Sequence, residues 1–155
     1  LQAEVLVTVY AAALEAKMYQ LDLGGVTVVH LGDTYLTPRL YAALEALPQP
    51  DLLLAPINGQ DFFRTQRNCI GNLEAEEAAQ LAVRLGAACT IPTHYDMVQG
   101  NTVDPLRFAA ALRQLDSAAC FALPALGERL LFQADAGRKD SSVFSCPPPS
   151  SSIQR

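Results

Sequence analysis

Three short segments of this 155-residue sequence combine side chains that hold metals, anions or protons. They read His30-Leu31-Gly32-Asp33-Thr34, then Pro56-Ile57-Asn58-Gly59-Gln60-Asp61, then Pro92-Thr93-His94-Tyr95-Asp96. Asp33 follows a glycine after an apolar run, which exposes a carboxylate where a divalent cation could take it; an Asx-turn or helix cap is the structural alternative. His94 holds an equivalent position, although a lone histidine at a strand end is often only a hydrogen-bonded structural residue. The equivalent positions of Asp33 and His94 favour a shared metal site over two separate structural roles, whereas His30 is expected to be structural and on the opposite face.

The segment between these positions is rich in anion-binding side chains. In a chain of net charge −5, arginines gathered with asparagines can clamp a phosphate or carboxylate. The candidate substrate-binding residues are Asn58, Arg64, Asn68 and Asn72. The alternative is a solvated loop in which the arginines pair with Asp61 and the nearby helix glutamates.

Predicted strands and helices alternate along the chain as βαβ units, and these units position the three segments. Apolar runs predict strands over residues 26–30, 52–55 and 88–92, with two short strands near 119–123 and 129–132. Residues 4–10 also read as a strand, while 11–17 are helix-prone. A loop is expected over 57–72, pinned to the core by Phe62 and Phe63.

Capping residues mark the helices between these strands. Thr37 and Pro38 open the first, Asn72 caps the second, which Gly86 closes, and Asp104 with Pro105 opens the third. Because the carboxyl ends of parallel strands meet at one edge of an open α/β sheet, Asp33 and His94 should approach one another there.

Composition excludes several classes of protein. Half the residues are hydrophobic and 17% are charged, as in a single globular domain. Acidic residues outnumber basic ones by 16 to 11, so neither nucleic acid nor an anionic membrane surface is an expected partner. The sequence has no apolar run long enough for a membrane span and no recognisable signal peptide, and its four cysteines form no C-x-x-C pair. We therefore expect a cytoplasmic location.

The composition changes near the C-terminus. Residues 134–155 are rich in Ser, Pro, Gly and charge and offer little apolar surface to offset their ordering entropy. The predicted division is a domain over residues 1–133 followed by a disordered Ser/Pro-rich tail over 134–155.

Taken together, the three segments resemble the metallo-β-lactamase superfamily, and most closely its L-ascorbate-6-phosphate lactonase-like branch. The residues that carry the resemblance are Val28 to Thr34, Pro56 to Asn72 around Arg64 and Gly71, and Ile91 to Met97 with Gly100-Asn101. The resemblance covers about residues 26–132 and corresponds to the C-terminal half of that fold. It implies an α/β fold in which βαβ units, with helices packed on a sheet, form half of an αββα sandwich.

The resemblance also implies a function. Asp33 matches the family's carboxylate that can bridge two metals, and His94 matches its last metal-binding histidine, so both are candidate catalytic residues. The implied cofactor is a divalent metal, Zn or Mn, as one or two ions. A metal-activated water would then open an anionic lactone or ester without a protein nucleophile. The family's His-x-His-x-Asp-His motif and middle histidine have no counterpart here, since His30 and His94 are the only histidines.

Three interpretations follow. The first is an incomplete copy of a lactonase-like, metal-dependent hydrolase that is inactive by itself, with its remaining ligands upstream of Leu1. The second is a non-catalytic remnant that binds an anion or a partner through the Arg64 loop. The third is an unrelated doubly wound α/β domain. In the incomplete form a sheet face stays uncovered, which favours a homo-oligomer.

Overall fold

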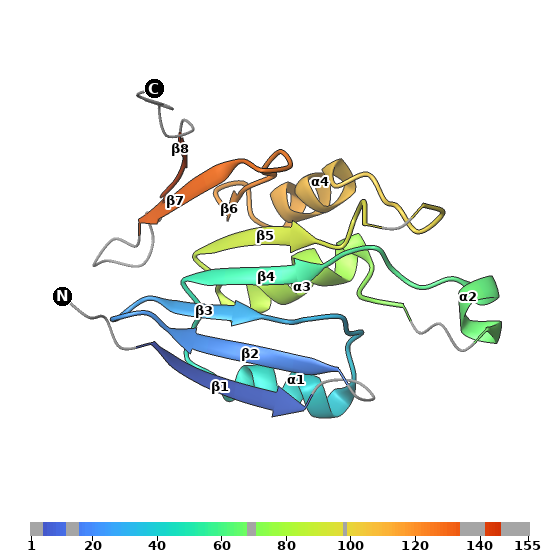
Figure 1. The fold of residues 1–155 in the computed structure, drawn as a ribbon, viewed down its shortest axis with the longest axis horizontal. Coiled ribbons are helices and arrows are strands. Elements are labelled where there is room, and N and C mark those ends of the chain that lie inside the picture. The colour runs from blue at the N-terminus through green and yellow to red at the C-terminus, as the bar shows by residue number, and fades with distance from the viewer. Residues whose placement is uncertain (1–4, 12–15, 68–70, 98, 134–141, 147–155) are drawn as a thin grey trace, which may run out of the picture.

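A mixed six-stranded sheet dominates the computed structural model, which describes residues 5–11, 16–67, 71–97, 99–133 and 142–146 (Figure 1). The strand order is β1-β2-β3-β4-β5-β6, formed by Leu6–Ala11, Lys17–Asp22, Thr27–His30, Leu52–Pro56, Cys89–Thr93 and Cys120–Phe121. The first three strands pair antiparallel, and β3 to β6 pair parallel. The expected α/β class is confirmed.

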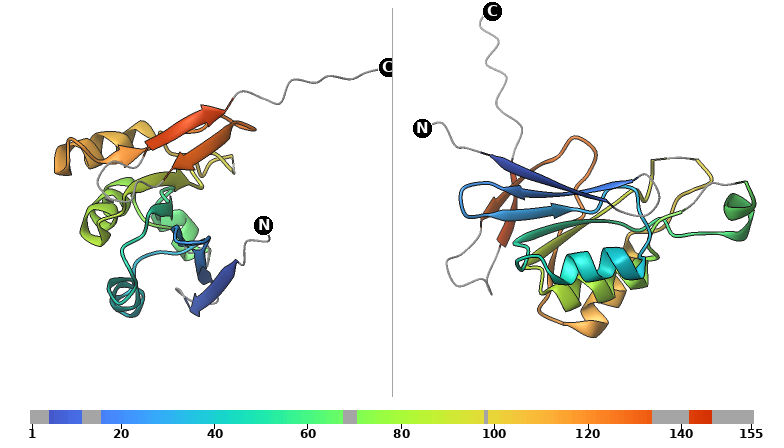
Figure 2. Two further views of the ribbon diagram at one scale, coloured as in Figure 1. Left: turned by 90° about the vertical axis from the view of Figure 1, so that its left-hand side faces the viewer. Right: turned by 90° about the horizontal axis from the view of Figure 1, so that it is seen from below.

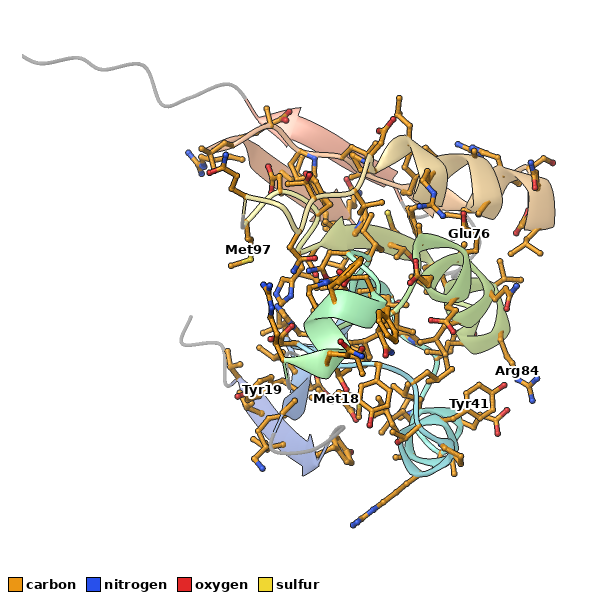
Figure 3. All side chains as sticks on the ribbon, turned by 90° about the vertical axis from the view of Figure 1, so that its right-hand side faces the viewer. Met18, Tyr19, Tyr41, Glu76, Arg84 and Met97 are labelled. Carbon is orange, nitrogen blue, oxygen red and sulfur yellow. The ribbon has the colours of Figure 1, made fainter. Side chains whose placement is uncertain are left out.

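Helices α1 (Pro38–Glu45), α3 (Ala75–Leu85) and α4 (Leu106–Leu115) cover one face of this sheet (Figure 2). Their buried side chains, among them Leu40, Leu81 and Phe108, pack with the sheet residues Val29 and Leu53 in one hydrophobic core. Arg84 of α3 lies over the ring of Tyr41 in α1, 4.8 Å from its centroid (Figure 3). No helix among the described residues is long and apolar enough to cross a membrane.

The helix ends follow local capping chemistry, with two corrections. Thr37 caps α1 by accepting the Leu40 N–H at 3.1 Å, and Gly86 ends α3 in the left-handed conformation, as expected. The expected cap Asn72 is wrong: Glu74 occupies the N-cap of α3, where its N–H donates to Glu77 Oε2 at 2.9 Å. The Asn72 side chain contacts other residues instead.

The start of α4 differs by one residue from the expectation. Pro105 is at the N-cap position, and Asp104 Oδ1 accepts the Leu106 N–H at 2.9 Å from just before the helix. Asp104 therefore still satisfies one of the free N–H groups of the first turn, as predicted for a cap.

The loop after β4 contains a short helix that the sequence did not predict, α2 (Phe62–Gln66), capped by Asp61. Figure 1 shows α2 lying beyond the ends of the strands. Phe62 and Phe63 are 67% and 72% exposed, so the expectation that they pin the loop to the core is wrong. Polar contacts of Arg64, described below, hold the loop in place of apolar packing.

The terminal parts of the chain also differ from expectation. Strand β2 is formed by residues 17–22, and its Met18 is fully buried. Its first residue, Lys17, is the last residue of the stretch expected to be helix-prone. Ser142–Cys146 forms β8, which pairs antiparallel with β7 (Arg129–Gln133). These five residues lie within the segment predicted to be a disordered tail; the backbone groups of β7 provide them with a partner, and Val143 and Phe144 favour strands. The rest of the tail lies outside the described residues.

Candidate metal and substrate site

The carboxyl ends of β3, β4 and β5 bring the three chemistry-bearing segments together. The arrowheads of these strands point to the same side in Figure 1. Backbone hydrogen bonds extend the ladder past the strand ends, from Leu31 N–H to Leu54 and from Ile57 N–H to Thr93, both at 3.0 Å. These bonds fix the positions from which Asp33, Asn58 and His94 project.

Two glycines allow the backbone to turn into the site. Gly32 has φ +71°, and a Cβ there would lie 2.3 Å from the carbonyl oxygen of Lys17. Gly71 lies so close to the opposite loop that a Cβ would be 2.1 Å from the Gly59 carbonyl oxygen. Only glycine permits these approaches, which place Asp33 and Asn72 next to the ends of β3 and β4.

Asp33 and His94 meet at this edge, as the sequence predicts. Asp33 Oδ1 lies 3.3 Å from His94 Nδ1. The amide nitrogen of Asn72 lies between them, donating to Asp33 Oδ1 at 2.7 Å and to Asn58 Oδ1 at 2.6 Å. Asn72 is 2% exposed, so a buried amide holds residues from three separate loops together.

Hydrogen-bond chemistry determines how the Asn72 amide is oriented. An ionised Asp33 only accepts, so the Asn72 nitrogen, not its oxygen, must face it. The two N–H bonds of the Asn72 amide are then used by Asp33 and Asn58. His94 Nε2 and Asp33 Oδ2 take part in none of these contacts.

Two buried oxygens near this edge have no hydrogen-bond partner among the described residues. They are Asn72 Oδ1 and Thr93 Oγ1. Buried polar atoms are nearly always satisfied in folded proteins, and exceptions concentrate where a ligand, ion or water belongs. Amide oxygens such as Asn72 Oδ1 are among the ligands that bind hard divalent cations in proteins.

His94 is held in an unusual backbone conformation. Its φ of +62° is the only positive value outside glycine among the described residues. This conformation costs a non-glycine residue about 1–3 kcal/mol and persists only where surrounding structure enforces it. The bond from Val103 N–H to the Tyr95 carbonyl at 2.9 Å fixes the chain beside His94.

His30 has the structural contact expected of it. Its Nδ1 accepts the Gly32 N–H at 2.9 Å, which stabilises the turn that presents Asp33. Burial, and secondarily the nearby His94, lower the pKa of His30 below its ordinary value. The lowered pKa favours the neutral form of the His30 ring.

The Arg64 guanidinium makes hydrogen bonds to several other residues of this chain. Its guanidinium contacts Asp61 and Asn101, and its Nη2 donates to the Asn58 and Gly59 carbonyls at 3.2 Å each. Hydrogen bonds from the backbone and side chain of Arg64 lower the pKa of Asp61. This pairing with Asp61 was the alternative to anion binding in the sequence analysis, in which the loop is solvated and its arginines pair with nearby carboxylates. The candidate Asn68 lies outside the described residues.

The donors present match part of a divalent-metal site. Two ligands bound tetrahedrally to zinc at about 2.0–2.1 Å are about 3.3–3.4 Å apart, and Asp33 Oδ1 and His94 Nδ1 are 3.3 Å apart. However, no group of three or more His, Cys, Asp or Glu side chains within the described ranges could hold a metal ion. Asp33 and His94 therefore fit two positions of a metal site and do not complete one.

The fold defines an α/β class of protein, a mixed sheet with helices packed on one face. The model of the β-lactamase superfamily domain matches residues 12–94, more than half of the sequence. The chain belongs to this superfamily. No curated protein sequence matches it closely enough to count as a relative.

Solved structures share the fold at low identity. The metallo-hydrolase Igni18 from Ignicoccus hospitalis is 17% identical with a TM-score of 0.62, and the match covers 92% of this chain and 54% of Igni18. A putative Zn-dependent hydrolase of the metallo-β-lactamase superfamily from Thermotoga maritima is 24% identical with a TM-score of 0.52, covering 68% and 50%. YhfI of Bacillus subtilis, a metallo-β-lactamase fold protein, is 19% identical with a TM-score of 0.51, covering 78% and 48%. The chain thus spans about half the length of the structures it matches.

Proposed function

We propose that this chain forms one half of a metal-dependent hydrolase that opens an anionic lactone or ester, with Asp33 and His94 as its contribution to the metal site. The observation that carries the proposal is their 3.3 Å approach at the carboxyl edge of the sheet, bridged by the buried Asn72 amide. Both Zn and Mn suit a carboxylate and an imidazole. When bound, such a metal would lower the pKa of a water and polarise the scissile carbonyl.

The residues of this chain have distinct tasks in the proposal. Asn72 orients Asp33 through the 2.7 Å hydrogen bond and keeps Asn58 beside it. His30 keeps the Gly32 turn in place, and the positive φ of His94 directs its ring into the cluster. Because only two ligand side chains meet here, the remaining donors come from outside the described residues.

Substrate binding is proposed for the loops around this pair. Asn58, Arg64, Asn68 and Asn72 are the residues proposed to bind the anionic part of the substrate. For Arg64 this requires that the substrate anion replace one of its present partners, because Asp61 and Asn101 already occupy its guanidinium. The exposed Asp33 carboxylate leaves the site open to a small molecule.

Calorimetric titration with ZnCl₂ and MnCl₂ tests the metal part of the proposal. The purified chain should bind either ion weakly, because two donors leave a zinc site half filled. Asp33→Asn and His94→Ala should each abolish that binding. Asp22→Asn is the matched control, because Asp22 is exposed and the asparagine keeps an oxygen for the Gly25 N–H. Binding that survives both site substitutions would refute the metal assignment.

A hydrolysis assay tests the catalytic part. A longer product of the same gene that contains this chain should open a phosphorylated sugar lactone, lose the activity to EDTA, and lose it again on His94→Ala. The 155-residue chain alone should be inactive. A rate that is indifferent to EDTA would refute metal-dependent hydrolysis. Metal binding without turnover by the longer product would favour the non-catalytic binding module, for which the two-donor site is the supporting observation.

A further inference from the structure

Cys89 and Cys120 lie side by side in the sheet, away from the site just described. They are register partners in the parallel pair of β5 and β6. Their sulfur atoms are 2.7 Å apart, and both thiols are free. Adjacent strands are about 4.7–4.9 Å apart, which is within the Cα separation of about 4.4–6.8 Å that a disulfide tolerates.

The two cysteines differ in access to solvent. Cys89 is fully buried, whereas Cys120 is half-buried near the edge of the sheet. Burial, and then the hydrogen bond from Cys120, raise the pKa of the Cys89 thiol well above its usual range. An oxidant therefore meets Cys120 first, and Cys89 is placed behind it.

The pleat places this pair on the face that the helices leave free. Phe121, the next residue after Cys120, packs edge-on against Phe108 of α4 with ring centroids 6.4 Å apart. Because successive side chains of a strand point to opposite faces, Cys120 and its partner Cys89 point away from α4. A covalent bond between them leaves the helix-facing core unchanged.

We propose that Cys89 and Cys120 form a thiol oxidation site that closes to an intramolecular disulfide in the presence of a peroxide. The sulfur of Cys120, after losing its proton, attacks one peroxide oxygen; the O–O bond breaks and one water leaves, giving a sulfenic acid. The sulfur of Cys89 then attacks that of Cys120, the S–O bond breaks, and the hydroxide leaves with the Cys89 proton as a second water. Two thiols are oxidised and one peroxide is reduced.

The test is oxidation of the reduced, purified chain with hydrogen peroxide, followed by mass spectrometry under non-reducing conditions. The chain should lose the mass of two hydrogen atoms, and peptide mapping should find Cys89 joined to Cys120. Dithiothreitol should reverse the change. A disulfide that involves Cys69 or Cys146, or an oxygen adduct on Cys120 with Cys89 still reduced, would overturn the proposal.

Two variants sharpen this test. The double substitution Cys69→Ser and Cys146→Ser leaves only the proposed pair and should still form the disulfide. Adding Cys89→Ser to it should stop the reaction at an oxygen adduct on Cys120. If the double variant folds but forms no disulfide, the proposal is wrong. If it does not fold, the peptide map of the unsubstituted chain decides by itself.

Discussion

Asn72→Asp is the substitution that probes the centre of the Asp33–His94 cluster most directly. The side chain keeps its size, but a carboxylate replaces the amide that now donates to Asp33 Oδ1 at 2.7 Å. An attractive hydrogen bond thus becomes a repulsion between two like charges. Asn58 can turn its own amide to donate to the new carboxylate, so the loss is concentrated at Asp33.

The size of this repulsion follows from Coulomb's law. Two unit charges 2.7 Å apart repel by about 6 kcal/mol at an effective dielectric constant of about 20 and by about 1.5 kcal/mol in water. The Asp33 side chain is 74% exposed, so solvent screens the pair strongly. We expect the free energy of unfolding to fall by about 2 kcal/mol, which lowers Tm by about 4–8 °C in a chain of this length.

Thermal unfolding with pH and metal as variables tests this reasoning. Repulsion raises the carboxyl pKa in the folded state above its unfolded value, so stability is recovered as pH falls through the raised pKa and one proton neutralises the pair. A divalent cation, MnCl₂ for example, should also recover it near neutral pH. Asn101→Asp is the matched control, because that carboxylate would face the Arg64 guanidinium. An unchanged Tm near neutral pH, or an equal loss near neutral pH and at about pH 4.5, would refute this account.

Two further predictions concern the turn before Asp33. Gly32→Ala should lower the free energy of unfolding in urea by about 2–4 kcal/mol, because it combines a positive φ with a Cβ 2.3 Å from the Lys17 carbonyl. Gly127→Ala, also at positive φ but in open space, should cost only about 1 kcal/mol, and equal losses would contradict the steric argument. Stability should fall as pH drops below about 6.5, because the lowered pKa keeps His30 neutral when folded while the unfolded chain takes up the proton. His30→Asn keeps a hydrogen-bond acceptor for the turn. In urea titrations it should make the free energy of unfolding less dependent on pH below about 6.5. An unchanged pH dependence would show that His30 is not its source.

Local patterns in the sequence were sufficient to predict most strands of the sheet and the helices that cover it. The three apolar runs became β3, β4 and β5, and Thr37 with Pro38 opened α1 as predicted. The strand β2 (Lys17–Asp22), whose Met18 is fully buried, was not predicted from the sequence. The alanines before it favour a helix locally, and only pairing with β1 and β3 makes the following residues a strand. The helix α2 was also missed, because residues 57–72 were predicted as a loop and five helical residues are too few to show a helical periodicity.

The sequence by itself determined the class of fold and the two residues at the centre of the site. Asp33 and His94 follow parallel strands, and the geometry of such strands obliges their carboxyl ends to share one edge. Only the tertiary structure decided what surrounds them. Asn72 reads locally as a helix cap, yet the approach of Gly71 to Gly59 turns it inward to bridge Asp33 and Asn58. The pairing of Cys89 with Cys120 likewise depends on strand register, because residues 31 positions apart meet only when the sheet forms.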